Sequence, residues 1–230
     1  MYDNIFKRVE KKFLLTEEEY QKLFKKISKM LKQDKYFEST ICNIYYDNEN
    51  NDLLINSIEK PIYKHKVRLR SYNIPSLDDD VFLEIKSKYK KVVGKRRIRL
   101  KLKEFKKYEQ TKKYKNDDQI IKEIDYLFNY YNLKPSYYVA YDRKCYVGKE
   151  DELLRITIDT NLRSRKENLT LEYGDDGILY FEKPTYIVEI KTLGAMPLWL
   201  VRSLSDLKIY PKSFSKIGNI YIKDKEEELC

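Results

Sequence analysis

The sequence predicts an α+β protein built around an antiparallel, closed β-barrel of about eight strands with flanking helices. Three strings carry this prediction: Arg68-Leu69-Arg70, Glu84-Ile85-Lys86 and Glu189-Ile190-Lys191. Each places two charged side chains two residues apart within a β-forming segment. Because side chains alternate between the two faces of a strand, both charges point to one face and the aliphatic residue to the other. Repeated along the chain, this pattern predicts a polar-lined barrel that binds an anionic ligand.

The predicted strands follow from the alternation of apolar and polar residues. The alternation is strict in Arg97–Lys103, and Gly94 between this segment and the preceding strand indicates a hairpin. Short gaps between strands favour antiparallel pairing. The predicted strands are Ile5–Leu15, Ser39–Asp47, Pro61–Tyr72, Val81–Tyr89, Arg96–Lys103, Ser136–Val147, Leu153–Arg163 and Tyr186–Thr192.

The predicted helices are marked by helical spacing of apolar residues and, at the first of them, by a start signal. Thr16 followed by Glu19 is a capping box. No structure is assigned to Pro211–Ile222, whose pattern fits no single element. The predicted helices are Glu17–Lys32, Asp52–Ile58, Glu104–Lys113, Asp117–Tyr131 and Pro197–Leu207.

Composition limits the class of protein. The chain has 230 residues and 42% hydrophobic residues, which suits one domain over residues 1–230. Its net charge of +10 implies an anionic partner, and nucleic acid, acidic lipid and polyphosphate all fit. Cys42, Cys145 and Cys230 are isolated, so we expect neither a disulfide framework nor a zinc site, and a reduced, cytoplasmic location. No apolar run long enough to span a membrane, no signal peptide and no Gly-rich phosphate loop is found.

Charged strand faces have two readings. On a single strand, such a face is usually the solvated side of an antiparallel sheet. Here the pattern recurs on seven predicted strands, which favours faces turned inward around one ligand. Two like charges about 4 Å apart repel by roughly 4 kcal/mol at an effective dielectric near 20, so clustered Lys and Arg would require a polyanion. The recurring charges are Arg8, Glu10, Lys12, Arg68, Arg70, Glu84, Lys86, Arg97, Arg99, Arg143, Arg155, Asp159, Glu189 and Lys191.

The order and spacing of these strings resemble the VTC domain, the polyphosphate polymerase branch of the CYTH or triphosphate tunnel metalloenzyme superfamily. The resemblance covers nearly the whole chain, from Phe6 to about Asn219. It implies a single antiparallel triphosphate tunnel domain that binds a nucleoside triphosphate and a divalent metal, and that makes polyphosphate from ATP with release of ADP. Its strings are Arg8-Val9-Glu10-Lys11-Lys12-Phe13, Ile44-Tyr45-Tyr46-Asp47, Val67-Arg68-Leu69-Arg70, Leu83-Glu84-Ile85-Lys86, Tyr141-Asp142-Arg143, Arg155-Ile156-Thr157-Ile158-Asp159, Val188-Glu189-Ile190-Lys191 and Phe214-Ser215-Lys216.

The resemblance also implies roles for individual residues. Glu189 would hold Mn²⁺ or Mg²⁺, with Glu10 as a second metal ligand. The catalytic group would be Arg70, Lys86, Arg143, Lys191 and Glu189. The phosphate-binding group would be Arg8, Lys12, Arg68, Arg70, Lys86, Arg99, Tyr141, Arg143, Arg155, Lys191 and Lys216. Tyr141 could equally be a core tyrosine and Lys216 a surface lysine. We expect His65, the only histidine, to lie on the surface.

One departure from the resemblance bears on the reaction. Tunnel triphosphatases typically begin with Glu-x-Glu-x-Lys, whereas this chain has Arg8-Val9-Glu10-Lys11-Lys12. Exchanging a metal-binding carboxylate for a guanidinium favours transfer to a polyphosphate end over hydrolysis, and leaves Glu10 as either a metal ligand or a partner of Lys12. We therefore expect a polyphosphate polymerase acting on ATP and polyphosphate. The alternatives are a tripolyphosphatase or nucleoside triphosphatase on the same fold, and a non-catalytic module that binds polyphosphate or nucleic acid. Nucleic acid is not the expected partner. Direct membrane insertion is not expected either, so a membrane link would come through another protein.

Overall fold

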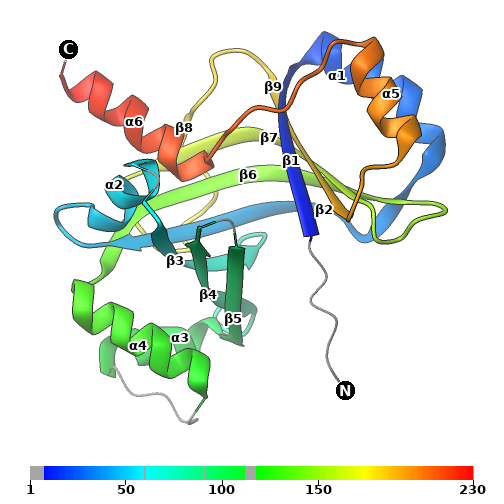
Figure 1. Cartoon of the computed structure of the whole chain (residues 1–230). Coiled ribbons are helices and arrows are strands. Elements are labelled where there is room, and N and C mark those ends of the chain that lie inside the picture. The colour runs from blue at the N-terminus through cyan, green and yellow to red at the C-terminus, as the bar shows by residue number, and fades with distance from the viewer. Residues whose placement is uncertain (1–7, 60, 91, 112–117, 230) are drawn as a thin grey trace. The chain divides into compact units, whose positions relative to one another are not determined.

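The computed structural model describes residues 8–59, 61–90, 92–111 and 118–229, and these form antiparallel strands and helices (Figure 1). The strands are β1 Arg8–Thr16, β2 Leu31–Asp47, β3 Tyr63–Tyr72, β4 Asp80–Tyr89, β5 Val92–Lys101, β6 Lys134–Gly148, β7 Arg155–Arg165, β8 Ile178–Leu179 and β9 Thr185–Leu193. The helices are α1 Glu17–Ile27, α2 Asp52–Glu59, α3 Leu102–Thr111, α4 Gln119–Tyr131, α5 Leu198–Asp206 and α6 Lys216–Glu228, with a short 3₁₀ helix at Ser28–Met30. The predicted α+β class with antiparallel strands is confirmed.

The strands are hydrogen-bonded in the order β1-β9-β7-β6-β2-β3-β4-β5, with β8 beside β7. Within the described residues, backbone pairing therefore begins at β1 and ends at β5 and does not join these two strands. By its contacts the chain divides into two compact units. Unit 1 comprises residues 1–39, 141–162 and 181–214, and unit 2 comprises residues 40–140, 163–180 and 215–230. Strands β2, β6 and β7 contribute residues to both units, and the prediction of one domain over 1–230 stays a prediction.

Unit 1 holds its helices against the apolar face of β1, β7 and β9. The capping box at the start of α1 is confirmed, because Glu19 N–H donates to Thr16 Oγ1 at 3.3 Å and Thr16 N–H donates to Glu19 Oε2 at 2.8 Å. Helices α1 and α5 lie side by side (Figure 1). The core joins strand residues such as Phe13, Ile156 and Val188 to Leu23 of α1 and to α5.

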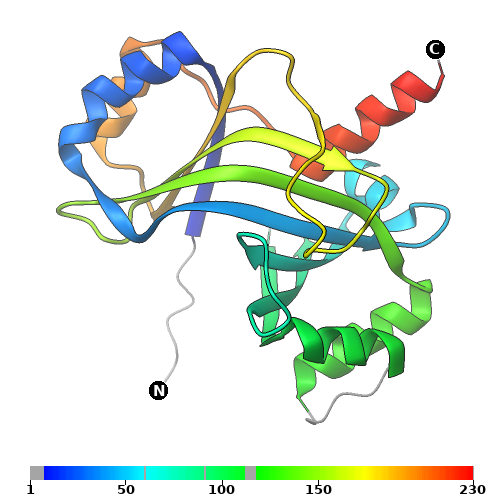
Figure 2. The same cartoon turned by 180° about the vertical axis from the view of Figure 1, so that it is seen from behind.

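Unit 2 is built on the meander β3-β4-β5, whose apolar face packs against α3 and α4 (Figure 2). Val67, Leu69, Leu83 and Ile85 point to this face and are at most 7% exposed. The turn between β4 and β5 lies at Lys90, which adopts a left-handed φ of 50°. The predicted hairpin is thus confirmed, but Gly94 is part of β5 and not of the turn.

Several elements differ from the sequence-based expectation. Helix α1 ends at Ile27 and not at Lys32, β5 begins at Val92 and not at Arg96, and β8 was not predicted. Strand β2 begins at Leu31, eight residues before the predicted Ser39, because its first half is mostly exposed and lacks the alternation that reveals a half-buried strand. The unassigned segment after Pro211 contains the start of α6. The Ser215 hydroxyl caps this helix by accepting from Gly218 N–H at 3.3 Å, and Ile217, Ile220 and Tyr221 are buried. Only the first two turns of α6 carry apolar residues that can mark a helix, since the segment after Ile222 is almost wholly charged.

The prediction that His65 lies on the surface is wrong. Its side chain points to the apolar face of β3 and is 6% exposed, between the rings of Tyr63 and Tyr131 at 5.5 and 5.2 Å. The flanking Lys64 and Lys66 point to the opposite face, so a lysine-rich string misled the prediction. Neither ring nitrogen has a hydrogen-bond partner among the described residues, and burial lowers the pKa of the imidazole below 6.5.

Replacing His65 by phenylalanine should reduce the loss of folding stability that the protein shows on mild acidification. Because the folded protein disfavours the imidazolium, the unfolded chain binds more protons once the pH falls below about 6.5, and this lowers stability down to the folded-state pKa. Phenylalanine keeps the ring contacts but removes the titration. Urea unfolding at pH 7.5 and 5.5 measures the difference, and an equal loss of stability in both proteins would contradict the assignment.

Candidate functional site

The polar face of the β3-β4-β5 meander in unit 2 carries a large excess of positive charge. The register pairs Arg68 with Glu84 and Glu84 with Arg97, which places these three side chains on one face. The same alternation gives this face ten basic residues and two acidic residues on the three strands. They are Lys64, Lys66, Arg68, Arg70, Lys86, Lys88, Lys95, Arg97, Arg99 and Lys101, with Asp80 and Glu84. We call this surface the basic face.

Glu84 is the buried carboxylate at the centre of the basic face. Its side chain is 1% exposed and pairs with cations on both neighbouring strands. Arg68 Nε donates to Glu84 Oε2 at 2.8 Å, and Lys95 Nζ lies 2.6 Å from Oε1. Burial by itself raises the pKa of Glu84, but Arg68, Arg70 and Lys95 outweigh it and lower the pKa to about 2. Glu84 therefore stays ionised and fixes the positions of Arg68 and Lys95.

Arg70 is held in the same manner by a neutral acceptor. Its Nε donates to Asn43 Oδ1 at 2.8 Å, and the Asn43 amide nitrogen donates to the carbonyl oxygen of Val139 at 2.9 Å. Asn43 is fully buried, and Arg70 is 6% exposed. Tyr45 completes the arrangement, since its hydroxyl accepts from Arg68 Nη1 at 3.2 Å. Both arginines of the Arg68-Leu69-Arg70 string are thus oriented by side chains from neighbouring strands.

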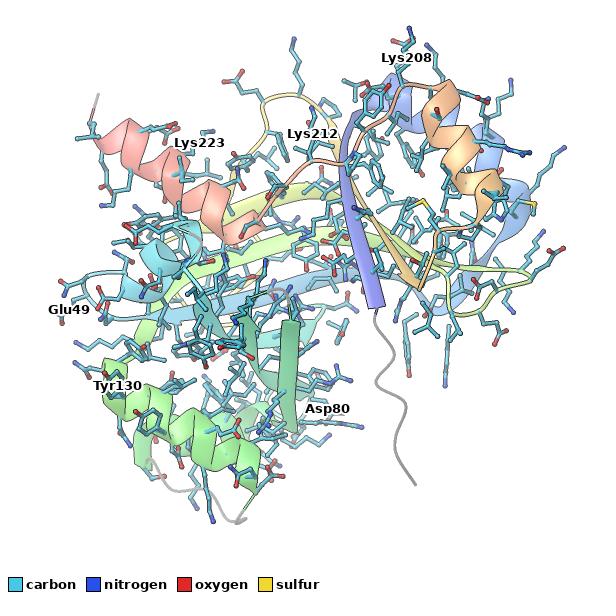
Figure 3. The ribbon with its side chains drawn as sticks, in the orientation of Figure 1. Glu49, Asp80, Tyr130, Lys208, Lys212 and Lys223 are labelled. Carbon is cyan, nitrogen blue, oxygen red and sulfur yellow. The ribbon has the colours of Figure 1, made fainter. Side chains whose placement is uncertain are left out.

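The other predicted residues of unit 2 lie nearer the solvent. Lys86 is on the basic face and exposed, and Arg99 is 67% exposed beside Asp80, which is labelled in Figure 3. Lys216 is half-buried in the first turn of α6. The sequence-based site omitted Lys66, which donates to Ser215 Oγ at 3.0 Å at the start of this helix, and Lys95. The alternation of β5 places Lys95 on this face, but the predicted strand began at Arg96, four residues after the start of β5 at Val92, and so excluded Lys95.

Unit 1 has a second polar face, on which charges of opposite sign alternate. The register places Lys12 of β1 opposite Glu189 of β9, and Glu10 opposite Lys191. Lys12 Nζ lies 3.5 Å from Glu10 and 3.4 Å from Glu189, and Lys191 Nζ lies 3.9 and 3.3 Å from the same two carboxylates. We call these four residues the charge quartet. Glu10 is therefore an ion-pair partner of both lysines, and its role as a metal ligand stays a prediction.

Arg143 lies beside the charge quartet in a bidentate pair. Its Nε and Nη2 donate to the two carboxylate oxygens of Asp159 at 2.6 and 2.8 Å, and Nη2 lies 3.8 Å from Glu189. Burial lowers the pKa of Arg143, but Asp159, Tyr141 and Glu189 more than offset this, so the pKa lies above its usual range. Tyr141 is 3% exposed, and its ring centroid lies 5.2 Å from the guanidinium carbon. Tyr141 is thus buried like a core residue and also contacts Arg143 on the charged face. Its predicted contact with phosphate stays a prediction.

Arg155 is more exposed than the other predicted residues of unit 1 whose side chains the structure describes. Its side chain is 44% exposed, its Nε donates to Cys145 Sγ at 2.9 Å, and its Nη2 lies 3.5 Å from Asp34. Cys42 and Cys145 are buried free thiols, and Cys230 lies outside the described residues. The side chain of Arg8, the first residue of β1, also lies outside the described part of the chain. The repulsion that the sequence predicts is therefore balanced within unit 1 by Glu10, Asp159 and Glu189, whereas the basic face of unit 2 keeps its excess charge.

The oxygen donors of unit 1 fit a hard divalent cation whose remaining ligands are phosphate and water. Glu10 and Glu189 supply carboxylate oxygens, and Mg²⁺ and Mn²⁺ prefer oxygen ligands and commonly bind through one or two carboxylates plus phosphate and water. The described residues contain no cluster of three His, Cys, Asp or Glu side chains that could hold a metal by themselves. A third side-chain oxygen is nevertheless available, because Thr157 lies directly opposite Glu189 in the register and its buried hydroxyl has no hydrogen-bond partner in the described structure.

Two solved structures share this fold at low sequence identity. One is a Bacillus halodurans protein described as an adenylate cyclase, with a TM-score of 0.55, 13% identity, and coverage of 90% of this chain and 93% of that chain. The other is a Hippeastrum protein described as an adenylyl cyclase with a dominant triphosphatase activity, with a TM-score of 0.51, 13% identity, and coverage of 92% and 94%. A search of curated proteins finds no match. At this level of identity the comparison shows that the chain shares the fold of these two proteins.

The sequence itself identifies the branch of this fold. The model of the VTC domain matches residues 7–221, which is nearly the whole chain. The chain therefore belongs to the VTC domain family, and the predicted resemblance is confirmed. Of the predicted site residues whose side chains the structure describes, Arg68, Arg70, Lys86 and Arg99 lie on the basic face, Lys216 lies in α6 of the same unit, and the others belong to unit 1. Within the described residues, no helix combines the length and apolar character needed to cross a bilayer.

Proposed function

We propose that this protein is a polyphosphate polymerase that transfers the γ-phosphoryl group of ATP to the end of a polyphosphate chain. The observation that carries the proposal is the charge of the basic face, with ten basic side chains and two acidic ones on three adjacent strands. Such a surface suits a ligand that repeats negative charge at short intervals, since guanidinium groups bind phosphate oxygens in pairs and ammonium groups add point charge. Membership of the VTC domain family supports the same reading.

The proposed mechanism relies on positioning and on electrostatic stabilisation, which are the main demands of phosphoryl transfer. In unit 2, the guanidinium groups of Arg68 and Arg70 would bind phosphate oxygens in orientations set by Glu84 and Asn43. In unit 1, Arg143 would do the same in an orientation set by Asp159. A terminal oxygen of polyphosphate would attack the γ-phosphorus in line, forming a new P–O bond as the bond to the leaving ADP breaks. The attacking oxygen is already anionic, so no general base is required. His65 is unsuited to that role, because it lies on the apolar face of β3.

Glu189, with Glu10, would hold Mn²⁺ or Mg²⁺ in this proposal. A divalent cation there would neutralise charge on phosphate oxygens during transfer. Lys12 and Lys191 lie within 3.4 Å of Glu189 and would turn from it toward phosphate, because an ammonium group and a dication compete for the same oxygens. The proposal includes a cytoplasmic location, which isolated cysteines favour, with any membrane attachment made through another chain.

Incubation of the purified protein with ATP and Mn²⁺ tests this proposal. A polymerase gives ADP and a ladder of polyphosphate on a gel. The triphosphatase activity of the Hippeastrum neighbour makes a hydrolase the second candidate, and a hydrolase gives inorganic phosphate without polymer. A protein that binds polyphosphate but turns over no ATP would be a binding module. If single-stranded DNA displaces bound polyphosphate and the affinity for DNA falls steeply with salt, the result would instead indicate a nucleic-acid ligand.

Tripolyphosphate should raise the melting temperature of the protein. A ligand at about 100 times its dissociation constant adds roughly 2.7 kcal/mol to the stability of the state that binds it. Thermal unfolding with millimolar tripolyphosphate measures the shift, with sodium chloride at equal ionic strength as the control. An equal melting temperature in both solutions would contradict a phosphate-binding basic face.

A further inference from the structure

Thr157 is a buried hydroxyl at the centre of the charged face of unit 1. It lies on β7 between Arg155 and Asp159, whose side chains point to the same face, and it is 1% exposed. The register of β7 and β9 places it directly opposite Glu189. Directly opposed residues of an antiparallel pair bring their Cβ atoms to about 4.5–5.5 Å, so the side chains of Thr157 and Glu189 begin as close neighbours on this face.

The hydroxyl of Thr157 has no hydrogen-bond partner among the residues that the structure describes. This is unusual, because buried hydroxyl groups in proteins are normally hydrogen-bonded. The other fully buried threonine follows the rule, since the Thr192 hydroxyl donates to the carbonyl oxygen of Gly194 at 3.1 Å. The carboxylate of Asp159, the next residue on this face of β7, accepts from Arg143 through both of its oxygens.

The position of Thr157 matches a need of the site. Two carboxylates, Glu10 and Glu189, give a hard divalent cation few protein ligands, and the described residues add no third acidic or imidazole ligand. A threonine hydroxyl is a neutral oxygen donor that binds Mg²⁺ or Mn²⁺, or one of the waters that these ions retain. A neutral ligand also adds no further negative charge beside Glu189, which already lies near Lys12, Lys191 and Arg143.

We infer that Thr157 is a further residue of the cation site, and that its hydroxyl binds a divalent cation held by Glu189, either directly or through one coordinated water. This inference rests on the metal dependence in the proposed function, and it adds a ligand that acidic side chains alone would not reveal. Lys12, Glu189 and Thr157 lie in one row across β1, β9 and β7. In this row Lys12 would bind phosphate, Glu189 would bind the metal through its carboxylate, and Thr157 would add a neutral oxygen ligand.

Binding of Mn²⁺ to the full chain without nucleotide tests the inference, by titration calorimetry and by the loss of the free Mn²⁺ signal in electron paramagnetic resonance. We expect Thr157→Val to weaken Mn²⁺ binding about 10–100-fold, as losses at metal and supporting ligands commonly do. Thr157→Ser keeps the hydroxyl and should bind within about threefold of the natural protein. Thr192→Val is the matched control, because it removes an equally buried hydroxyl on the opposite face of β9 and should leave Mn²⁺ binding unchanged.

The outcomes separate this inference from the proposed function. If Thr157→Val binds Mn²⁺ as tightly as the natural protein while Glu189→Gln loses binding, Thr157 is not a ligand and the cation site stands without it. If the natural protein itself binds no Mn²⁺, the inference falls with the metal site, and polymer synthesis from ATP decides the proposed function separately. Circular dichroism of each variant shows whether it has folded, and Thr157→Ser keeps the test open if valine prevents folding.

Discussion

Replacing Arg70 by alanine should lower the rate of phosphoryl transfer by about 10²–10³-fold, the loss typical of removing one donor that stabilises transition-state charge. Arg70 is 6% exposed, and the Asn43-Val139 contact fixes its guanidinium. The fold should tolerate the change. Alanine leaves the Asn43 oxygen without its donor, which costs about 1–3 kcal/mol, but it also removes one positive charge from the crowded basic face. Steady-state kinetics with ATP and Mn²⁺ measure the rate, and thermal unfolding measures the stability.

Arg96→Ala is the matched control for this experiment. Arg96 is an arginine of β5 that points to the opposite face, where its side chain is 55% exposed and pairs with Glu123 of α4. It removes the same charge from the same sheet without touching the basic face. We expect its rate to stay within about twofold of the natural protein, since surface ion pairs contribute little. Full activity of Arg70→Ala, or an equal loss in both variants, would remove the basic face from the mechanism.

Replacing Glu84 by glutamine should lower the free energy of unfolding more than any other single change on the basic face. Removing one partner of a fully buried ion pair costs about 3–5 kcal/mol, because the other charge is left uncompensated. Lys95 is 43% exposed and water screens part of its charge, so we expect about 2–3 kcal/mol. Urea unfolding at pH 7 measures this loss. Asp78→Asn is the control, because Asp78 pairs with Lys103 at the surface and is 77% exposed.

The pH dependence of the same pair gives a second readout. The folded-state pKa of Glu84 is about 2, against an ordinary value of 4.5, so its ionisation stabilises the folded protein fully above about pH 4.5. This contribution, about 3 kcal/mol, is lost as the pH falls from about 4.5 to about 2. Glu84→Gln should lack this part of the acid transition. An identical acid transition in both proteins would show that Glu84 is not the buried anion between Arg68 and Lys95.

The cations of the site could be predicted from the sequence, because two charged residues at spacing two in a β-forming string must share a face. The side chains that orient those cations could not. Glu84 is the partner of both Arg68 and Lys95 only because β3, β4 and β5 pair in one register, and no spacing within a single strand reports that register. The role of Asn43 could not be predicted, since a lone asparagine in an apolar strand matches no sequence pattern. The role of Thr157 could not be predicted either, because its position opposite Glu189 depends on the pairing of β7 with β9.

The fold itself followed the same division. Strands with one buried face, such as β3 and β4, were predicted within two residues because burial imposes alternation. The first half of β2 was missed because it is mostly solvated on both sides, and alternation disappears where neither face is buried. His65 was misplaced for a related reason. Its neighbours Lys64 and Lys66 are what alternation would place opposite a buried residue, but a histidine gives no indication of which face it takes.

The excess charge of the basic face has a practical consequence for handling the protein. Multivalent anions in a buffer would act as folding ligands, because any anion that binds the folded sheet shifts the unfolding equilibrium by mass action. Melting temperatures recorded in sodium phosphate and in Tris chloride would then describe two different liganded states. Under the proposed function, purification from cells rich in condensed phosphates would yield protein with polyphosphate bound, so a high-salt wash belongs before any affinity measurement.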